Sequence, residues 1–329
     1  MAGPFAWATV RHHVGPSVQD QRREPPAHNR EGKDGVRLLK PSAFEYHAPR
    51  SVDEAVKLLA DLGDGAKVLA GGQSLVPMLS LRLAYFDHLV DIARIPELQG
   101  IRVDADAVTI GATTVDADLE GNDEIAAKVP LLAKVTPFIG HFQIRNKGTV
   151  GGSIAHADPA AEYPAVALTL DAEIEAISPR GRRTIPASEF FVGFWTSALE
   201  SDEVLASVRF PVWSGRTGFA VKEFARRHGD FALAGAVVGV EIGGDETVTR
   251  CAIGLIGLGP TPLRAAVAEQ AAIGTAVAEL DVAALGLAAV SDLDEVPSDL
   301  HGSADYRKRV GAAMVERALN EAIEEATRG

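Results

Sequence analysis

The chain has 329 residues, of which 47% are hydrophobic, and a formal net charge of −13 from 32 Lys and Arg against 45 Asp and Glu. This length and apolar content exclude disorder of the whole chain, and the lack of a basic block argues against nucleic acid as a partner. The single cysteine, Cys251, excludes an internal disulfide framework and a cysteine-ligated zinc or iron–sulfur centre within the chain.

The first segment, residues 1–36, is rich in Pro, Gly, Arg and His and has neither helical nor strand periodicity. It predicts a disordered leader or a wrongly assigned start, with translation beginning at Val36 from a GTG codon. The segment lacks the apolar core of a signal peptide, and no apolar run in the chain reaches transmembrane length. We therefore expect a soluble protein, and the single cysteine makes the cytoplasm its expected location.

Regular structure begins near residue 41, where FEYHAP predicts a short strand. Ser51 and Glu54 form a capping box at the start of a helix that ends at Gly63 and Gly65. The buried strand AKVLA follows, so that residues 43–70 form a β-α-β unit. The apolar face of the helix is predicted to consist of Val52, Ala55, Val56 and Leu59.

The middle of the chain alternates strands and helices. HLVDI predicts a strand, IRVDADAVTIGA a hairpin and residues 124–141 a helical segment. Pro159 is expected in the first turn of a helix that carries Ala165 to Leu168. AEIEAIS and RRTIP flank the turn PRG as a second hairpin, and DEVLASVRFP predicts another strand. A domain boundary is expected near residues 211–216, followed by three antiparallel strands and a final helix from about Ala304.

Two glycine pairs carry the strongest chemical signal. Gly71 and Gly72 follow the strand AKVLA, and Gly151 and Gly152 lie in GTVGGS. Each pair alone is explained by turn geometry, but glycine also lets a ligand approach the backbone, where unpaired N–H groups bind phosphate. Two such turns, with hydroxyls nearby from Ser74, Thr149 and Ser153, suit a pyrophosphate. The G-x-G-x-x-G fingerprint and the lysine-bearing nucleotide loop are absent, which excludes an ordinary Rossmann protein.

Four long motifs resemble a known family: LAGGQSLVPMLSLRLAYFDHLVDIARIPEL, IRNKGTVGGSIAHADPAAEYPA, GDFALAGAVVG and YRKRVGAAMVERAL. In this order and spacing they resemble the FAD-binding medium subunits of molybdenum hydroxylases, the family of carbon monoxide dehydrogenase and xanthine dehydrogenase flavoproteins. The resemblance runs from about residue 38 to the C-terminus. It implies an α+β fold, with a two-subdomain FAD-binding domain of the PCMH type over residues 37–212. A domain of the carbon monoxide dehydrogenase flavoprotein type, an antiparallel sheet with helices, is implied over residues 213–329.

The resemblance also implies cofactor-binding residues. Those of the first glycine turn are Ala70, Gly71, Gly72, Gln73, Ser74 and Leu75, and those of the second are Thr149, Val150, Gly151, Gly152 and Ser153. Glu162 stands where the family usually has an aspartate that contacts the flavin nucleotide. Leu205 and Lys222 fall at positions that border the isoalloxazine. The register at Lys222 is open by one position, and a solvated strand lysine explains it equally well.

Other polar residues do not indicate catalysis by this chain. Asp158, directly before Pro159, is more simply a cap or an Asx turn than an acid–base partner of His156. His141 and His228 have no companions at metal-ligand spacing. We therefore expect no catalytic residue and no metal ligand here.

The resemblance implies that the bound FAD receives electrons from [2Fe–2S] clusters of an iron–sulfur small subunit and passes them to a quinone, a cytochrome or NAD. A molybdopterin large subunit would complete a dimer of heterotrimers, which associates with the inner face of the membrane through its acceptor. Three alternatives stay open. They are a stand-alone two-loop FAD oxidoreductase, the FAD subunit of a xanthine, N-heterocycle or aldehyde dehydrogenase, and a scaffold that has lost its flavin.

Overall fold

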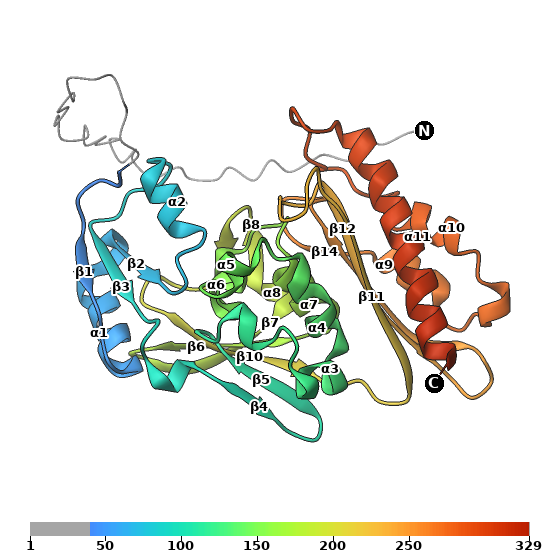
Figure 1. Cartoon of the computed structure of the whole chain (residues 1–329), viewed down its shortest axis with the longest axis horizontal. Coiled ribbons are helices and arrows are strands. Elements are labelled where there is room, and N and C mark those ends of the chain that lie inside the picture. Colours follow the sequence, from blue (N-terminus) through green and yellow to red (C-terminus); the bar gives the residue numbers. More distant parts are fainter. Residues whose placement is uncertain (1–39, 329) are drawn as a thin grey trace, which may run out of the picture. The chain divides into compact units, whose positions relative to one another are not determined.

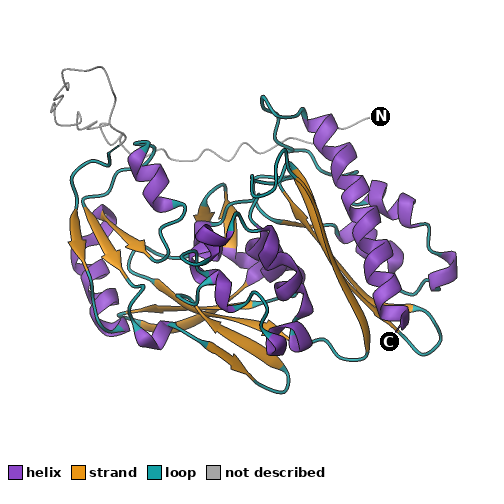
Figure 2. Cartoon of the chain, in the orientation of Figure 1, coloured by secondary structure: helices purple, strands orange, loops and turns teal. Residues whose placement is uncertain are grey.

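The computed structural model describes residues 40–328, which contain four β-sheets with helices between and beside them (Figure 1, Figure 2). The predicted leader and the alternative start at Val36 lie outside the described residues. The mixture of helices and strands confirms the predicted α+β class. Among the helices of the described part, none is both long and apolar enough to cross a membrane.

The first sheet is parallel and has the strand order β1-β3-β2. Its strands are β1 (Glu45–His47), β2 (Ala66–Leu69) and β3 (His88–Asp91), with α1 (Val52–Leu62) and the short η1 (Gly63–Gly65) between the first two. The predicted β-α-β unit is confirmed, but β3 lies between β1 and β2. A local pattern over residues 43–70 does not reveal this insertion, because β3 comes later in the chain.

Helix α1 shows how the sequence sets its own start. The Ser51 hydroxyl accepts the Glu54 N–H at 3.2 Å, and the Glu54 carboxylate accepts the backbone N–H of Arg50 at 2.8 Å. Gly63 ends the helix with a φ of 62°, which glycine adopts without strain. The buried residues of α1 are those predicted: Val52, Ala55, Val56 and Leu59.

The second sheet is antiparallel, in the order β4-β5-β10-β6-β7. Its strands are β4 (Ile101–Val103), β5 (Ala107–Gly111), β6 (Glu173–Ser178), β7 (Gly181–Pro186) and β10 (Val204–Pro211). Both predicted hairpins and the predicted strand DEVLASVRFP are confirmed. The smaller elements around it are η2 (Pro96–Leu98), η3 (Asp116–Asp118), α8 (Ala187–Phe190) and the two-stranded ribbon of β8 (Phe191–Gly193) and β9 (Thr196–Ser197).

Helices fill the stretch between β5 and β6. They are α3 (Asp123–Lys128), α4 (Pro130–Val135), η4 (Thr136–Phe138), α5 (Phe142–Arg145), α6 (Val150–His156) and α7 (Glu162–Thr169). The predicted helical segment 124–141 is thus broken. Pro130 starts a new helix because it has no N–H to donate and holds Val129 outside the helical region. The expectation for Pro159 is wrong, since α7 begins three residues later, at Glu162.

The third sheet confirms the three antiparallel strands predicted beyond Pro211, in the order β11-β12-β13-β14. The bounds are β11 (Arg216–Phe224), β12 (Ala234–Ile242), β13 (Val248–Ile256) and β14 (Leu263–Arg264), followed by α9 (Ala266–Ala272), η5 (Val277–Glu279) and α10 (Val282–Ala288). The final helix is α11 (Ala304–Arg328), which lies along β11 and β12 (Figure 1).

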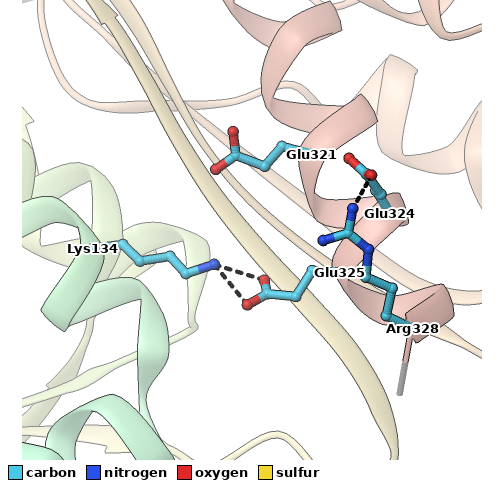
Figure 3. A pocket seen from close by; sticks show the side chains of 5 residues that line it. All are labelled: Lys134, Glu321, Glu324, Glu325 and Arg328. Carbon is cyan, nitrogen blue, oxygen red and sulfur yellow. Dashed lines mark hydrogen bonds and ion pairs between the residues drawn. The ribbon is translucent and has the colours of Figure 1, made fainter.

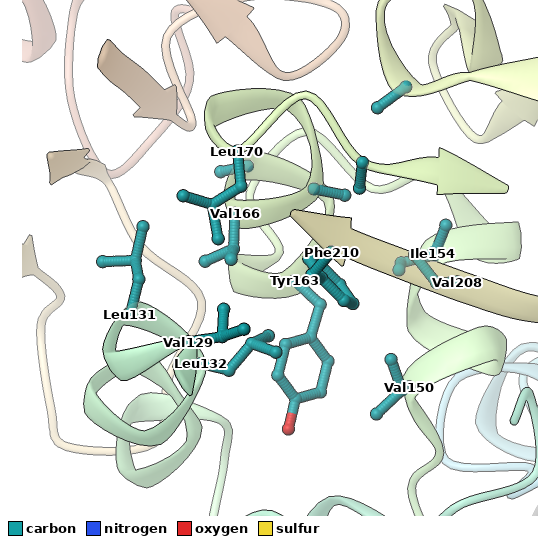
Figure 4. Close-up of a cluster of buried hydrophobic side chains, with 14 of the residues drawn as sticks. Val129, Leu131, Leu132, Val150, Ile154, Tyr163, Val166, Leu170, Val208 and Phe210 are labelled. Carbon is teal, nitrogen blue, oxygen red and sulfur yellow. The ribbon is translucent and has the colours of Figure 1, made fainter. Parts of the chain in front are cut away.

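The main apolar core lies between the second and third sheets. Tyr163 of α7 and Phe210 of β10 are both fully buried in it (Figure 4), and Val221 of β11 and Val237 of β12 belong to the same cluster. The expected boundary at residues 211–216 falls in the link between β10 and β11. Apolar packing is therefore continuous across that link.

Candidate functional site

The first glycine segment, residues 70–75, links β2 to α2 (Leu75–Ser80). Gly72 has a φ of +72°, a left-handed conformation that glycine adopts without strain, and its carbonyl accepts the N–H of Val76 at 3.0 Å. The Gln73 side chain donates to the carbonyl of Gly71 at 3.0 Å. The segment is thus a strand-to-helix turn, and α2 is an element that the sequence analysis did not predict.

The backbone N–H groups of this segment are available to a ligand. Within residues 40–328, no hydrogen bond uses the N–H of Gly71, Gly72, Gln73, Ser74 or Leu75. Five consecutive N–H groups without partners form a concentration of donors that a ligand with several acceptor oxygens satisfies. The prediction of unpaired donors is confirmed for the first glycine segment.

The second glycine segment, residues 149–153, is different. It is the first turn of helix α6, with Thr149 as the N-cap, so the prediction of a turn here is wrong. The N–H groups of Val150, Gly151, Gly152 and Ser153 donate to the Thr114 carbonyl at 3.1 Å, the Ala112 carbonyl at 3.0 Å, the Thr149 hydroxyl at 3.1 Å and the Thr149 carbonyl at 2.9 Å. The prediction of unpaired donors is therefore wrong for this segment, because a cap and the residues after β5 already satisfy them.

The two segments nevertheless meet. A Cβ on Gly71 would lie 2.1 Å from the carbonyl oxygen of Lys147, two residues before Thr149. A Cβ on Gly152 would lie 3.7 Å from the Cβ of Ala70. Glycine at position 71 thus lets the backbones of the two segments come into contact.

Within the second glycine segment, only part of the chain is left for a ligand. Val150 is fully buried in the main core, and a Cβ on Gly151 would lie 2.5 Å from the Cα of Ala112. Gly151 is therefore a glycine because α6 packs against the end of β5. Gly152 and Ser153 remain half-buried, and Gly152 faces Ala70 of the first segment.

Three carboxyl groups with buried or half-buried side chains, which we call the buried acids, have strongly raised pKa values. Burial raises the pKa of Glu162, at the start of α7, to about 7. Burial and then the charge of Glu162 raise the pKa of Glu223, in β11, and that of Asp116, in η3, each to about 8. In the described part of the structure, one carboxyl oxygen of Asp116 and one of Glu223 have no hydrogen-bond partner. At neutral pH, Asp116 and Glu223 are therefore largely protonated, and Glu162 is about half protonated. The sequence analysis identified only Glu162.

Leu205 and Lys222 occupy different surroundings. Leu205, in β10, is 4% exposed and belongs to the main core. Lys222, in β11, forms an ion pair with Glu321 of α11. Side chains alternate along a strand, so Lys222 lies on the face covered by α11, whereas Glu223 lies on the face of Val221 and the main core. The sequence analysis predicted strand β11, so this alternation could have identified Glu223 as a side chain that faces the main core.

The structure gives Asp158 the Asx turn expected from the sequence. Its carboxylate accepts the N–H of Ala160 at 2.8 Å and the indole N–H of Trp195 at 3.1 Å. The ring of His156 stacks on that of Trp195, with 5.6 Å between ring centres. Asp158 thus fixes the loop before α7 and positions Trp195.

A charged groove lies where α4 approaches the end of α11 (Figure 3). Lys134 donates to both carboxylate oxygens of Glu325 at 2.7 Å, and Glu325 also accepts the backbone N–H of Phe219 at 2.6 Å. Glu324 pairs with Arg328 one turn along the helix. These charges satisfy one another, so we interpret the groove as a structural joint.

Comparison with known proteins identifies two families along the chain. Residues 42–213 match the family of the FAD binding domain in molybdopterin dehydrogenase. Residues 219–322 match the carbon monoxide dehydrogenase flavoprotein C-terminal domain. Together the two families account for most of the described chain.

Individual relatives are similar over nearly their whole length. The carbon monoxide dehydrogenase medium chain of Hydrogenophaga pseudoflava is 44% identical over 86% of this chain and 98% of its own. The 6-hydroxypseudooxynicotine dehydrogenase complex subunit alpha of Paenarthrobacter nicotinovorans is 43% identical over 88% and 97%.

Solved structures are equally similar. A carbon monoxide dehydrogenase structure from Hydrogenophaga pseudoflava matches with a TM-score of 0.84 and 45% identity, over 87% of this chain and 99% of that one. Quinoline 2-oxidoreductase from Pseudomonas putida 86 matches with a TM-score of 0.82 and 35% identity, with the same coverage. The chain therefore belongs to the family of FAD-binding medium subunits of molybdenum hydroxylases of the carbon monoxide dehydrogenase and xanthine dehydrogenase type.

Proposed function

We propose that this chain holds FAD between its two glycine segments and passes electrons from [2Fe–2S] clusters of a partner subunit to an external acceptor. Family membership supports the cofactor. The observation that carries the proposal for the site is the run of five consecutive backbone N–H groups, from Gly71 to Leu75, without partners among the described residues. A pyrophosphate offers the acceptor oxygens that such a run requires.

The chain's own residues would divide the work of binding. Ala70, Gly71, Gly72, Gln73, Ser74 and Leu75 bind the pyrophosphate, and Thr149, Val150, Gly151, Gly152 and Ser153 form the opposing side. In that opposing side, Thr149, Val150 and Gly151 act as support, because their polar or apolar groups are already engaged by α6 and the core. Gly152 and Ser153 are the members that remain half-buried and free to contact a ligand.

The flavin end of the site would lie toward the buried acids. Glu162 supplies a polar contact to the nucleotide, and Leu205 borders the ring. Lys222 is already paired with Glu321 of α11. This ion pair favours a correspondence with the family shifted by one residue, in which Glu223 and not Lys222 is the neighbour of the ring. Bound FAD supplies the one- and two-electron redox chemistry. With a pKa raised to about 8, the Glu223 carboxyl group is mostly neutral at pH 7 and would place no full negative charge beside the ring.

The electron donors must come from other chains. Cys251 is buried, and burial raises the pKa of its thiol to about 12, so it is not a ligand for a cluster. We propose an iron–sulfur small subunit and a molybdopterin large subunit as partners, in a dimer of heterotrimers. The acceptor would be a quinone, a cytochrome or NAD.

A second candidate concerns the substrate of the whole complex. One relative at 43% identity belongs to a 6-hydroxypseudooxynicotine dehydrogenase complex, and another, at 36% identity, is a caffeine dehydrogenase subunit. These names favour an N-heterocyclic substrate as the alternative to carbon monoxide. In both cases the proposed role of this chain is the same.

The proposal is tested in the purified complex, captured through a tag on this chain. Addition of the substrate should bleach the visible absorption bands of the iron–sulfur clusters and of the flavin. The reduced complex should then reduce the added acceptor. A complex that carries Gly72→Val should lack FAD and keep reducible clusters, but no longer reduce the acceptor. Acceptor reduction at the normal rate by a complex without FAD would contradict the electron route.

A further inference from the structure

Three potential metal ligands meet on one face of the first sheet. Glu45 and His47 are two residues apart in β1, so their side chains point to the same face. His88 of β3 stands directly opposite Glu45 in the parallel pairing, and therefore shares that face. The side chain of Tyr46, between the first two, points the other way and donates to Asp91. The pairing of β1 with β3 thus brings together two imidazoles and a carboxylate.

The distances between the three groups match those around a bound ion. His47 Nε2 lies 3.2 Å from His88 Nδ1, His88 Nδ1 lies 3.4 Å from a Glu45 carboxylate oxygen, and that oxygen lies 4.0 Å from His47 Nε2. Ligands about 2.0–2.1 Å from a tetrahedral zinc ion stand about 3.3–3.5 Å apart from one another. An ion placed between the three atoms therefore requires only a small movement of Glu45.

The two histidine side chains are half-buried, whereas the glutamate side chain faces solvent. The side chains of His47 and His88 are 24% and 23% exposed, whereas that of Glu45 is 74% exposed. Ala66 and Val90, on the same face, pack in the apolar core under α1. The imidazoles are thus held by the sheet, and the carboxylate is free to close over an ion that arrives from solvent.

We propose that Glu45, His47 and His88 bind one divalent transition-metal ion of the zinc class, with water as the fourth ligand. Two imidazoles and one carboxylate are a donor set that suits zinc and its neighbours in preference to magnesium or calcium. The ion connects β1 to β3 and stabilises the sheet that leads into the first glycine segment. The sequence analysis expected no metal ligand, because His88 lies 41 residues from His47 and no local spacing connects them.

The test uses the full chain and Zn²⁺ alone, at about pH 7.5, because imidazole binds a metal ion in its neutral form. Calorimetry should find one site per chain, and Zn²⁺ should raise the midpoint of thermal unfolding. Glu45→Gln changes an exposed side chain and should still fold, yet it should weaken binding by more than about tenfold, since the loss of an outer-shell partner alone costs about 10–100-fold. His88→Gln should abolish both effects.

The matched control is the double variant His141→Ala with His228→Ala, which removes another neighbouring pair of histidines, with ring centres 6.1 Å apart. It should bind Zn²⁺ like the unmodified chain. Binding that is equal in the unmodified chain, Glu45→Gln and His88→Gln would overturn the proposal and assign the ion to other histidines. An absence of stoichiometric binding would also overturn it, and would leave a metal-free hydrogen bond between His47 and His88.

Discussion

The two glycine segments share a pair of glycines with a serine one or two residues later, yet the structure uses them in opposite ways. In the first segment, Gly72 adopts a positive φ and five N–H groups are left without partners among the described residues. In the second, the glycines lie in the first turn of α6 and every N–H from Val150 to Ser153 is taken. A glycine pair therefore leaves backbone N–H groups free for a ligand in one segment and lies in a tightly packed helix start in the other.

This difference shows what decides the role of a glycine pair. The first pair leaves a strand and has no capping side chain, because Ser74 makes no cap hydrogen bond at the start of α2. The second pair follows Thr149, which caps α6. Capping and the neighbouring carbonyls of Ala112 and Thr114 thus determine whether N–H groups stay available for a ligand.

The largest effect on stability is expected for Gly151→Ala. The new methyl group would overlap the backbone of Ala112, 2.5 Å away, and overpacking of this kind costs about 1–3 kcal/mol or more. Gly72→Ala should cost only about 1–2 kcal/mol, because its side-chain neighbours lie at 3.1 Å or more and the main penalty is the positive φ. Urea unfolding of both variants measures the difference. Equal losses would show that the second segment is not the more tightly packed of the two.

The second segment also lies beside a buried acid, which makes the stability of the FAD-free chain depend on pH. Asp116 donates its N–H to the carbonyl of Gly148 at 3.0 Å, and burial raises the pKa of its carboxyl group from 3.8 to about 8. Between about pH 4 and pH 8, this group is protonated when folded and ionised when unfolded. The free energy of unfolding should therefore fall as the pH rises through this window, by up to about 1.4 kcal/mol per unit for one such group.

Asp116→Asn should make that fall less steep, because it removes the proton that the folded state retains. Asp118→Asn, at an exposed position two residues later, is the matched control and should leave the slope unchanged. Thermal unfolding at several pH values between 4 and 8 compares them. A slope unaffected by Asp116→Asn would mean that Asp116 is ionised in the folded chain.

The smallest changes in unfolding free energy are expected when the hydroxyl group of Thr149 or that of Ser74 is removed. Thr149→Val removes the acceptor for the Gly152 N–H and should cost about 1 kcal/mol of unfolding free energy. Ser74→Ala should cost less than about 0.5 kcal/mol in the FAD-free chain, since no cap is lost. Denaturant midpoints measured side by side provide the comparison. A larger loss for Ser74→Ala would reverse the assignment of which segment is capped.

Local patterns in the sequence predicted most of the fold. The capping box at Ser51 and the alternating strands depend on neighbours within a few residues, and they are confirmed. The position of β3 between β1 and β2 depends on pairing across the chain and was not predicted. The break before Pro130 was visible as a proline, but a helical pattern on both sides concealed it.

The sequence predicted which residues form the candidate site better than it predicted how they are arranged. Family motifs located both glycine segments, but which N–H groups are free depends on contacts with Thr114 and Ala112, far from either motif. Glu223 and Asp116 carry no motif, and their raised pKa values arise from tertiary burial. Such properties belong to the packed structure and are not encoded in local spacing.

The most direct test of the account is the FAD affinity of Gly72→Val beside that of Gly274→Val. Both positions have a positive φ, +72° and +83°, but Gly274 lies in the C-terminal region with open space around it. Both variants therefore carry similar backbone strain. The account predicts that Gly274→Val retains FAD and that Gly72→Val loses it, because the valine displaces the run of N–H groups. Equal FAD retention by two folded variants would contradict the role of the first glycine segment.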